Sequence, residues 1–406
     1  MNLSKEQKII HDNIMDWWRS LTYRSINKHI SCAGFAGTGK TTLLAELRKT
    51  IHNENENTSV AFVTFTGKAS SVIKEKLNKN NCIYSSDFVG TIHSLIYRPV
   101  MGFNNVGKKV IVRWEKTPSL FVNLIIIDEA SMVSTEIFSD LDSYGIPIIA
   151  FGDHGQLAPV NGETTSIITN PDFILTEIHR QAEGNPIIKL SKYVRDYGKI
   201  PTGVFGEGVF KIPINHEKCK ELLNNADYMS QDLIVLCGMN RTRVALTKKI
   251  RHQLGFTREE PYPGERMICL KNNHNTKIMN GQLGTLVWMT YSEPELLEMT
   301  IQLDGFSEVY SGVVCNCFCL ENYDSLYDNF REKNYIKILK DKKSPFVNID
   351  FFDFGYAISV HRSQGSEFNK VILFEERSSY WDDDFYRRWL YTAVTRAKEK
   401  LFIVGR

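Results

Sequence analysis

The chain has 406 residues, of which 42% are hydrophobic and 24% are charged. This ordinary globular composition excludes disordered, collagen-like and coiled-coil architectures for the chain as a whole, and the length favours two or three domains. No apolar run approaches the roughly 18–20 residues that span a bilayer. The first residues lack the apolar core of a signal peptide, and the eight cysteines are irregularly spaced. We therefore expect a cytoplasmic protein in a reducing compartment, without a membrane partner.

The net charge of +2 hides an uneven distribution. Residues 1–120 contain 17 Lys and Arg against 9 Asp and Glu, a net charge of +8, and the remaining residues carry a net charge of −6. A basic N-terminal part permits a nucleic-acid partner without requiring one.

The N-terminal half alternates between strand and helix patterns. Residues 3–22 carry apolar side chains at helical spacing, and Ser4 with Gln7 three positions later forms a capping-box pattern. The all-apolar run Leu124–Ile127 is typical of a central parallel strand that is buried on both faces. The predicted strands are 29–33, 60–64, 124–127 and 146–151, and the predicted helices are 41–51 and 69–77. This alternation predicts a parallel sheet flanked by helices.

The alternation is interrupted twice. Ile96–Val100 and Val110–Trp114 predict a β-hairpin around a turn at 102–107 that is rich in glycine and asparagine. The α/β pattern returns at 233–254 and again at 371–404. Four short strands are predicted in between, at 267–270, 283–290, 299–303 and 309–319. The sequence therefore predicts two α/β domains, each with a β-rich insertion.

Residues Gly34–Thr41 match the phosphate-loop pattern G-x-x-x-x-G-K-[ST] between a predicted strand and a predicted helix. The glycines allow backbone N–H groups to surround phosphate oxygens, and the helix N-terminus adds a partial positive charge. Lys40 would neutralise the β- and γ-phosphates, and the Thr41 hydroxyl would bind Mg²⁺. The predicted nucleotide-binding residues are Gly34, Ala36, Gly37, Thr38, Gly39, Lys40, Thr41 and Thr42.

Two adjacent acids follow the buried strand at 124–127. Adjacent acids at the end of a buried strand are costly to leave unpaired, which favours a functional role for both. Asp128 would hold Mg²⁺, and Glu129 would act as general base on the attacking water. Gln156 follows the next predicted strand and could sense the γ-phosphate, although the spacing alone is equally compatible with a loop glutamine.

These segments together resemble the motifs of superfamily 1 helicases. The phosphate loop, Asp128–Ser131 and Gly152–Leu157 look like motifs I, II and III. Further matches follow in the expected order along nearly the whole chain: Leu175–Gln181 looks like motif IV, Gly355–Phe368 like motif V and Tyr391–Ala397 like motif VI. The form of motif V is similar to the RecD-like and Dda-like branch, which implies 5′→3′ movement on single-stranded DNA. Ala158 and Ser359 depart from the commonest motif residues without removing a catalytic group.

The resemblance implies two RecA-like parallel-sheet domains with a pin hairpin and an SH3-like barrel as insertions. The first domain, 1A, would comprise 1–180 with the 1B pin hairpin at about 90–116. The second, 2A, would comprise 181–264 and 350–406, with the SH3-like domain 2B inserted at 265–349.

The resemblance also assigns roles around the nucleotide. Gln7 would read adenine, and Glu367 of motif V would contact the nucleotide. Arg180 and Arg396 would reach the γ-phosphate, so ATP and Mg²⁺ are the expected cofactors.

DNA-contact candidates come from the segments that resemble the family's DNA-binding motifs, and backbone contacts need hydroxyls, amides and cations. They are Thr66, Lys68, Thr91, His93, Ser359 and His361. Arg241 and Arg243 lie in a segment, 240–255, with five basic residues and no acid, which is equally typical of a solvated helix face. Phe103, near the hairpin tip, would either stack on a base or pack onto its own domain.

The remaining cysteine and tryptophan residues are predicted to pack in the protein interior rather than to bind a ligand. Cys315, Cys317 and Cys319 would share one face of a strand as buried thiols, since no second ligand pair supports zinc. Trp17 and Trp18 would be packing residues.

The predicted function is an ATP-dependent 5′→3′ DNA helicase that acts on single-stranded DNA and duplex junctions. It would work as a monomer in a bacterial or phage-infected cell, with a single-strand-binding protein as a candidate partner. An RNA-directed enzyme and an ATP-switched remodelling or loading module remain the alternatives.

Overall fold

The computed structural model describes residues 3–21, 28–103, 109–159, 165–178, 184–273, 276, 278–305, 309–319, 321 and 349–405. Its contacts divide the chain into two compact units. Unit 1 comprises Met1–Val100, Arg113–Gly198 and Arg387–Thr392. Unit 2 comprises Met101–Val112, Lys199–Tyr386 and Ala393–Arg406. Unit 1 thus continues past the expected boundary at residue 180.

Unit 1 is built on a six-stranded parallel sheet with the order β3-β2-β6-β7-β1-β8. The strands are β1 (His29–Gly34), β2 (Val60–Thr64), β3 (Phe88–Thr91), β6 (Leu124–Ile127), β7 (Ile148–Gly152) and β8 (Phe173–Leu175). The helical elements are α1 (Lys5–Ser20), α2 (Lys40–Glu54), α3 (Gly67–Lys79), α4 (Ile92–Ile96), η1 (Ala130–Met132), α5 (Thr135–Asp142), α6 (Ser166–Thr169) and α8 (Pro186–Tyr197).

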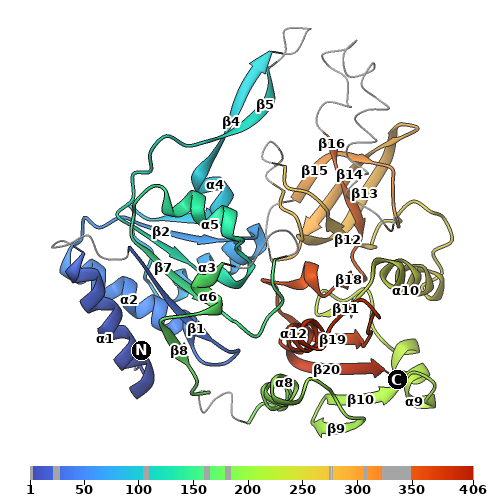
Figure 1. The fold of residues 1–406 in the computed structure, drawn as a ribbon. Coiled ribbons are helices and arrows are strands. Elements are labelled where there is room, and N and C mark those ends of the chain that lie inside the picture. The colour runs from blue at the N-terminus through green and yellow to red at the C-terminus, as the bar shows by residue number, and fades with distance from the viewer. Residues whose placement is uncertain are drawn as a thin grey trace. The chain divides into compact units, whose positions relative to one another are not determined.

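Both faces of this sheet are covered, because alternate residues of its strands enter two separate cores (Figure 1). Phe62 and Ile126 pack with α1, α2 and α3, whereas Val63 and Ile127 pack with α4, α5 and α6. Trp17 and Trp18 pack against the first core, as predicted.

Unit 2 contains a second α/β sheet with the order β18-β11-β19-β20-β10-β9, parallel except for the edge strand β9. Its strands are β9 (Gly203–Gly206), β10 (Val209–Pro213), β11 (Leu233–Cys237), β18 (Ala357–Ser359), β19 (Phe368–Phe374) and β20 (Ala397–Gly405). The helical elements in this part of the chain are α9 (Glu217–Asn224), α10 (Asn240–Gln253), η3 (His361–Ser363) and α12 (Asp383–Val394). α12 precedes β20, and its residues Arg387–Thr392 belong to unit 1.

Both predicted β-rich insertions form sheets. β4 (Tyr97–Phe103) and β5 (Lys109–Lys116) make a two-stranded hairpin where the sequence predicted one. The second insertion forms a six-stranded sheet with the order β16-β15-β14-β13-β12-β17. Its strands are β12 (Arg266–Cys269), β13 (Leu283–Glu293), β14 (Leu296–Leu303), β15 (Val309–Cys315), β16 (Ile349–Asp350) and β17 (Phe352–Phe354).

The predicted cysteine alternation is wrong beyond residue 315. β15 ends at Cys315, which is buried, whereas Cys317 and Cys319 follow the strand and are half-buried. Cys319 has a φ of 57°, which no strand residue adopts. All eight cysteines are free thiols. Among the described residues, no helix has the length and apolar character needed to cross a bilayer.

A buried ion pair secures the start of β2 in unit 1. Arg48 of α2 donates from Nε and Nη2 to the two carboxylate oxygens of Asp87, at 2.9 Å each, and both side chains are fully buried. Asp87 also accepts from the backbone N–H groups of Val60 and Tyr84.

We predict that Asp87→Ala lowers the free energy of unfolding of unit 1 by about 3–5 kcal/mol, because it leaves the Arg48 guanidinium buried without its counter-charge. Urea denaturation followed by circular dichroism measures the change. Glu75→Ala is the matched control, since Glu75 pairs with Lys79 in an exposed helical pair and should cost less than about 1 kcal/mol. Equal losses in the two variants would contradict the stabilising role of the buried pair.

Candidate nucleotide-binding site

Three neighbouring strands of unit 1 end in the segments that the sequence singled out. In the sheet, β6, β7 and β1 lie side by side and run in the same direction. β6 leads into Asp128 and Glu129, β7 leads into Asp153–Gln156, and β1 leads into the phosphate loop. Because the strands are parallel, these three segments leave the sheet at one edge, which is where α/β proteins bind their ligands.

The phosphate loop contains backbone conformations with positive φ angles, which glycine adopts more easily than other residues. Gly37 and Gly39 have φ values of 82° and 77°, in the left-handed region. A Cβ at Gly34 would lie 2.6 Å from Thr38 Oγ1. That hydroxyl donates to the carbonyl of Phe35 at 2.8 Å and closes the loop.

The N-terminus of α2 is suited to an anion. Its N-cap residue, Gly39, makes no side-chain capping bond, and the first turn of this fully described helix holds no acid. The Lys40 ammonium donates to the loop carbonyls of Gly34 and Phe35, at 2.5 and 3.2 Å, which keeps its charge beside the loop. Thr41 and Thr42 are half-buried in the first helical turn. The loop therefore fits the phosphates of a nucleotide.

Gln7 ties the first helix to the phosphate loop. Its side-chain oxygen accepts from the Ser4 N–H in the predicted capping box of α1. Its amide nitrogen donates to the carbonyls of Thr38 and Gly39 at 3.2 Å each, and the residue is buried. The predicted contact with adenine stays a prediction, and the structure adds a role in holding the loop.

Asp128 and Glu129 stand at the end of β6 with a constrained backbone. Glu129 has a φ of 55° and a ψ of 40°, a left-handed conformation that is uncommon for a non-glycine residue. Its N–H donates to Asp128 Oδ1 at 3.0 Å. Both side chains are half-buried. A carboxylate and a threonine hydroxyl are oxygen ligands of the kind Mg²⁺ prefers, so Asp128 and Thr41 fit the predicted metal role.

Asp153 is the functional-site residue that the sequence reasoning missed. It is fully buried and accepts from Gly155 N at 3.0 Å, Tyr391 Oη at 2.7 Å and Gln156 Nε2 at 3.4 Å. Tyr391 Oη in turn accepts from the N–H of Ala36 in the phosphate loop, at 3.0 Å. Gln156 is thereby held beside Asp153, with its side-chain oxygen buried and making no hydrogen bond. The placement of Asp153 directly after an all-apolar strand was the available signal.

An aromatic contact joins the loops after β1 and β7. The Phe35 and His154 rings lie 4.4 Å apart, and the Arg195 guanidinium lies 3.9 Å from the Phe35 ring centre. Burial lowers the pKa of His154, the charge of Asp153 opposes this shift, and the charges of Arg388, Lys40 and Arg195 add to it. The imidazole is therefore neutral at neutral pH and packs as an aromatic ring.

The predicted nucleotide residues Arg396 and Glu367 of unit 2 differ in burial. Arg396 is buried and donates to the carbonyl of Ser366 at 3.0 Å and to the Thr395 hydroxyl at 3.1 Å, so it joins the segments predicted as motifs V and VI. Glu367 is exposed, 3.8 Å from Lys398. Arg180 lies outside the described residues.

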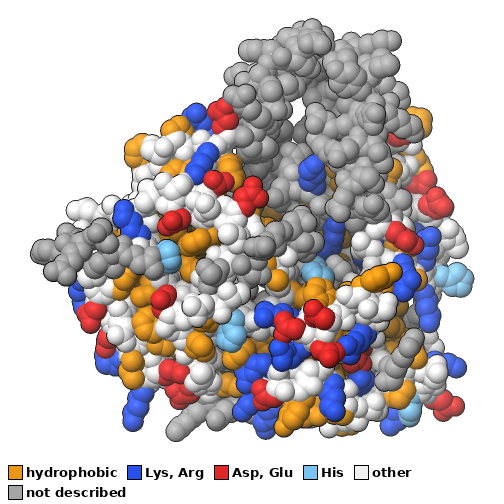
Figure 2. Space-filling model, in the orientation of Figure 1, with side chains coloured by type: hydrophobic (Ala, Val, Ile, Leu, Met, Phe, Trp, Pro, Cys, Tyr) orange, Lys and Arg blue, Asp and Glu red, His pale blue; other side chains and the backbone are white. Residues whose placement is uncertain are grey.

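The DNA-contact candidates of unit 1 have local structural roles as well. The Thr66 and Thr91 hydroxyls cap α3 and α4. Lys68 is half-buried, and His93 is exposed with its ring 5.8 Å from that of Phe65. The candidate Phe103 belongs to unit 2, where it ends β4, and its side chain lies outside the described residues. On the face drawn in Figure 2, the described basic side chains are interspersed with acidic ones rather than gathered in one broad patch.

The candidates Ser359 and His361 of unit 2 lie at the end of β18 and in η3. Ser359 is nearly buried, and its hydroxyl accepts from Arg362 N at 3.4 Å. Burial lowers the pKa of His361, so it would meet a phosphate as a neutral N–H donor rather than as a cation.

The structure argues against Arg243 as a DNA contact. Its side chain is 2% exposed and donates to Asp353 at 2.8 Å inside unit 2. Arg241 is exposed at the start of α10 and stays a candidate. The N–H groups of Gly238 and Met239, just before that helix, both donate to Glu376, which takes the position an anion would take.

Two segments match known families. Residues 21–162 match the family described as AAA domain, and residues 354–404 match the UvrD-like helicase C-terminal domain.

Two curated relatives match almost the whole chain. The ATP-dependent RecD2 DNA helicase of Deinococcus radiodurans is 23% identical, over 99% of this chain and 49% of its own length. The ATP-dependent DNA helicase dda of Enterobacteria phage T4 is 24% identical, over 93% of this chain and 94% of its own. The chain thus spans about half of RecD2, and it spans 36% of another curated relative.

A solved structure shares the fold. The crystal structure of Bacteroides Pif1 bound to ssDNA matches with a TM-score of 0.52 and 18% sequence identity. The match covers 99% of this chain and 92% of the Pif1 chain. The two RecA-like sheets predicted from the sequence are confirmed.

We predict that Arg243→Ala lowers the free energy of unfolding of unit 2 by about 3–5 kcal/mol, because it leaves Asp353 buried without its counter-charge. Arg241→Ala, two positions away on the exposed side of α10, should leave stability within about 0.5 kcal/mol and weaken binding of single-stranded DNA. Chemical denaturation and fluorescence anisotropy with labelled oligo(dT) measure the two properties. An Arg243→Ala variant of normal stability with weakened DNA binding would reinstate Arg243 as a contact.

We predict that Glu129→Gln binds ATP normally but hydrolyses it about 10²–10⁴-fold more slowly, because the amide keeps the shape of the side chain and cannot accept a proton. Binding of a fluorescent ATP analogue and release of phosphate separate the two steps. Glu136→Gln, on exposed α5, serves as the control and should leave both steps unchanged. Loss of nucleotide binding in Glu129→Gln would contradict the role as base.

Proposed function

Because the chain belongs to the RecD-, Dda- and Pif1-like branch of superfamily 1 helicases, we propose that it is an ATP-dependent DNA helicase that moves 5′→3′ on single-stranded DNA. The observation that carries the ATP-driven part is the shared edge of β6, β7 and β1. There the uncapped N-terminus of α2 follows the phosphate loop, and Asp128, Glu129 and Gln156 lie in the segments that follow the adjacent strands β6 and β7.

The residues of unit 1 divide the chemistry among them. The backbone of Gly37–Gly39 and the Lys40 ammonium would bind the β- and γ-phosphates. Thr41 and Asp128 would hold Mg²⁺, which when bound neutralises charge that develops on the phosphate oxygens. Glu129 would accept a proton from the attacking water. Asp153 holds the side chain of Gln156 in place by accepting a hydrogen bond from its amide.

Arg180 and Arg396 would supply cations for the γ-phosphate, and Arg396 would do so from the second half of the chain. A phosphate that is contacted by residues from both halves favours one arrangement of those halves, and its loss on hydrolysis removes the preference. Repeated hydrolysis could then be converted into movement along DNA. The contact of Arg396 with Ser366 connects this arginine to the segment that holds the DNA candidates Ser359 and His361.

The proposed 5′→3′ direction is supported by the form of motif V, which is similar to that of the RecD-like and Dda-like branch, and not by the geometry. The printed names of RecD2 and Dda say that these relatives are ATP-dependent DNA helicases. We further propose that the protein works as a monomer on DNA junctions in a bacterial or phage-infected cell, and that the β4–β5 hairpin separates the strands, with Phe103 near its tip.

We predict that the protein unwinds a duplex with a 5′ single-stranded tail, in the presence of ATP and Mg²⁺, and leaves a duplex with a 3′ tail intact. A fluorophore and a quencher on the two strands report separation. Lys40→Ala should reduce both ATP hydrolysis and unwinding to background, because it removes the main cation from the β- and γ-phosphates.

Each other outcome changes the proposal. Unwinding from the 3′ tail alone would overturn the direction and keep the chemistry. DNA-stimulated hydrolysis without unwinding would favour an ATP-switched remodelling or loading module. Stronger stimulation by single-stranded RNA than by DNA would favour an RNA-directed enzyme.

A further inference from the structure

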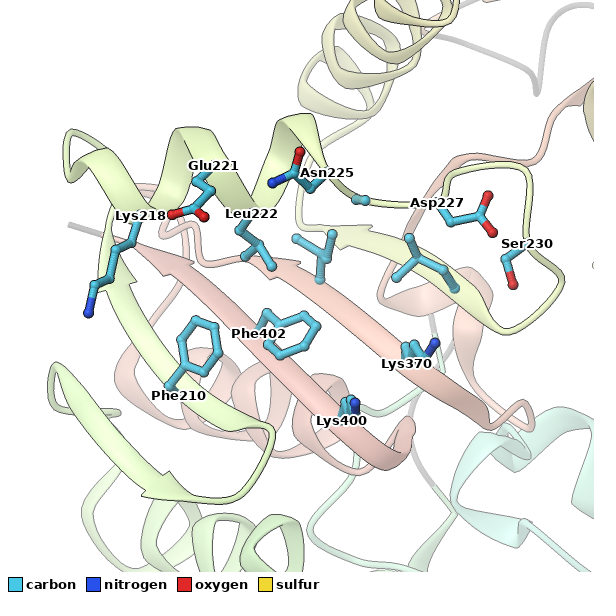
Figure 3. A pocket seen from close by; sticks show the side chains of 13 residues that line it. Phe210, Lys218, Glu221, Leu222, Asn225, Asp227, Ser230, Lys370, Lys400 and Phe402 are labelled. Carbon is cyan, nitrogen blue, oxygen red and sulfur yellow. The ribbon is translucent and has the colours of Figure 1, made fainter.

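Unit 2 carries an open groove that none of the nucleotide or DNA roles uses. The helix α9 passes over β10, β20 and β19 and leaves part of the sheet uncovered (Figure 3). The groove has a volume of about 480 Å³. Its apolar lining includes Phe210 and Phe402, whose ring centres lie 4.9 Å apart, together with Leu222 and Ile372.

The groove stays open because α9 is short. This helix has eight residues, and Cys219 is its buried anchor in the core of unit 2. Leu222, three positions later, lies over the groove together with Phe402 (Figure 3). Phe210 and Phe402 are therefore only half-buried. Half-buried aromatic rings at the bottom of a concave surface are the kind of anchor pocket that a large apolar side chain fills.

Two lysines stand side by side in the same groove. Lys370 of β19 and Lys400 of β20 are directly opposite each other in the parallel register. Since side chains alternate along a strand, they share a face with Ile372 and Phe402, which lie two residues further on. Like charges in this position disfavour each other. Neither ammonium has an ion-pair partner in the described part of the chain, so an anionic group on a ligand would relieve the repulsion.

The opposite side of the groove has a different character. Glu221 and Asp227 line it from α9 and the following loop, together with Lys218 of α9 and the polar side chains of Asn225 and Ser230 (Figure 3). Two carboxylates would repel the continuous phosphate backbone of a nucleic acid. A peptide meets both sides, because it carries backbone N–H donors for the carboxylates and can carry acidic side chains for the lysines.

We propose that this groove docks an acidic peptide segment of a partner protein. One large apolar side chain of the segment would enter between Leu222 and the Phe210–Phe402 pair. Its carboxylates would contact Lys370 and Lys400. The proposal is independent of the helicase activity, because none of the lining residues belongs to the nucleotide or DNA sites.

A selection from a phage-displayed library of random short peptides, with the full-length protein immobilised, tests the proposal. The variant is Lys370→Glu with Lys400→Glu, and the matched control is Lys220→Glu, an exposed lysine of α9 outside the groove. We expect enrichment of peptides that combine acidic residues with a Phe, Leu or Trp. The best of these, synthesised with a fluorophore, should bind the double variant at least tenfold more weakly than the wild type and the control. Unchanged ATP hydrolysis and circular dichroism would show that the double variant folds.

Several results would overturn the proposal. One is the absence of acidic sequences among the selected peptides, and another is equal binding of the selected peptide to the wild type and the double variant. A third is displacement of the peptide by oligo(dT), which would make the groove a nucleic-acid contact. A fourth is self-association in analytical ultracentrifugation that is lost in the double variant, which would make the occupant a second copy of the chain. Phe210→Ala gives an independent check, because loss of the aromatic anchor should also weaken the peptide by severalfold.

Discussion

The parallel register of β6, β7 and β1 is the constraint on which the candidate site depends. Ile127 pairs with Ala150, and Ala150 pairs with Ser31, so three segments that are separated in sequence leave the sheet at matched heights. A shift of one residue between two strands would move a loop by about 3.3 Å and turn every side chain of that strand to the other face. The two separate cores, one on each face, therefore fix the positions of the loops of the candidate site as well as the sheet.

The loops themselves hold their shape at some cost to the backbone. Glu129 occupies a left-handed conformation that costs a non-glycine residue about 1–3 kcal/mol. Its N–H donates to the carboxylate of Asp128, and a 3₁₀ turn, Ala130–Met132, follows directly. The chain thus reverses immediately after β6, which keeps both acids at the edge of the sheet. In the phosphate loop, the same requirement for positive φ is met by Gly37 and Gly39.

Local patterns predicted the elements well and the partners of charged residues poorly. The all-apolar runs and the phosphate-loop spacing carry their information within a few residues, so β2 and β6 have the predicted bounds. Arg243 was placed on DNA because its segment is basic, but its partner, Asp353, lies 110 residues further along the chain. Nothing within the segment could reveal that pairing. The position of Asp153 after an apolar strand was a local signal, but its bond with Tyr391, 238 residues further along the chain, could not be predicted from the segment. The edge strand β9 and the short helix α9 had no strong periodicity to predict them.

The inserted sheet of unit 2 is an insertion in sequence but not a separate packing unit. One continuous core joins Val235 and Ile372 of the parallel sheet to Met267 and Leu286 of the inserted sheet. Two buried arginines reinforce the junction, because Arg243 and Arg251 of α10 bind Asp353 and Glu265.

These contacts also connect the two ends of the insertion. Glu265, at the entry, accepts from the hydroxyl of Tyr356, at the exit, at 3.1 Å. Tyr356 leads directly into β18, which ends at the DNA candidate Ser359. Because ordered cores deform little, we infer that the inserted sheet moves together with the parallel sheet. A displacement of β18 in response to the nucleotide would then carry the inserted sheet with it, without a separate hinge inside unit 2.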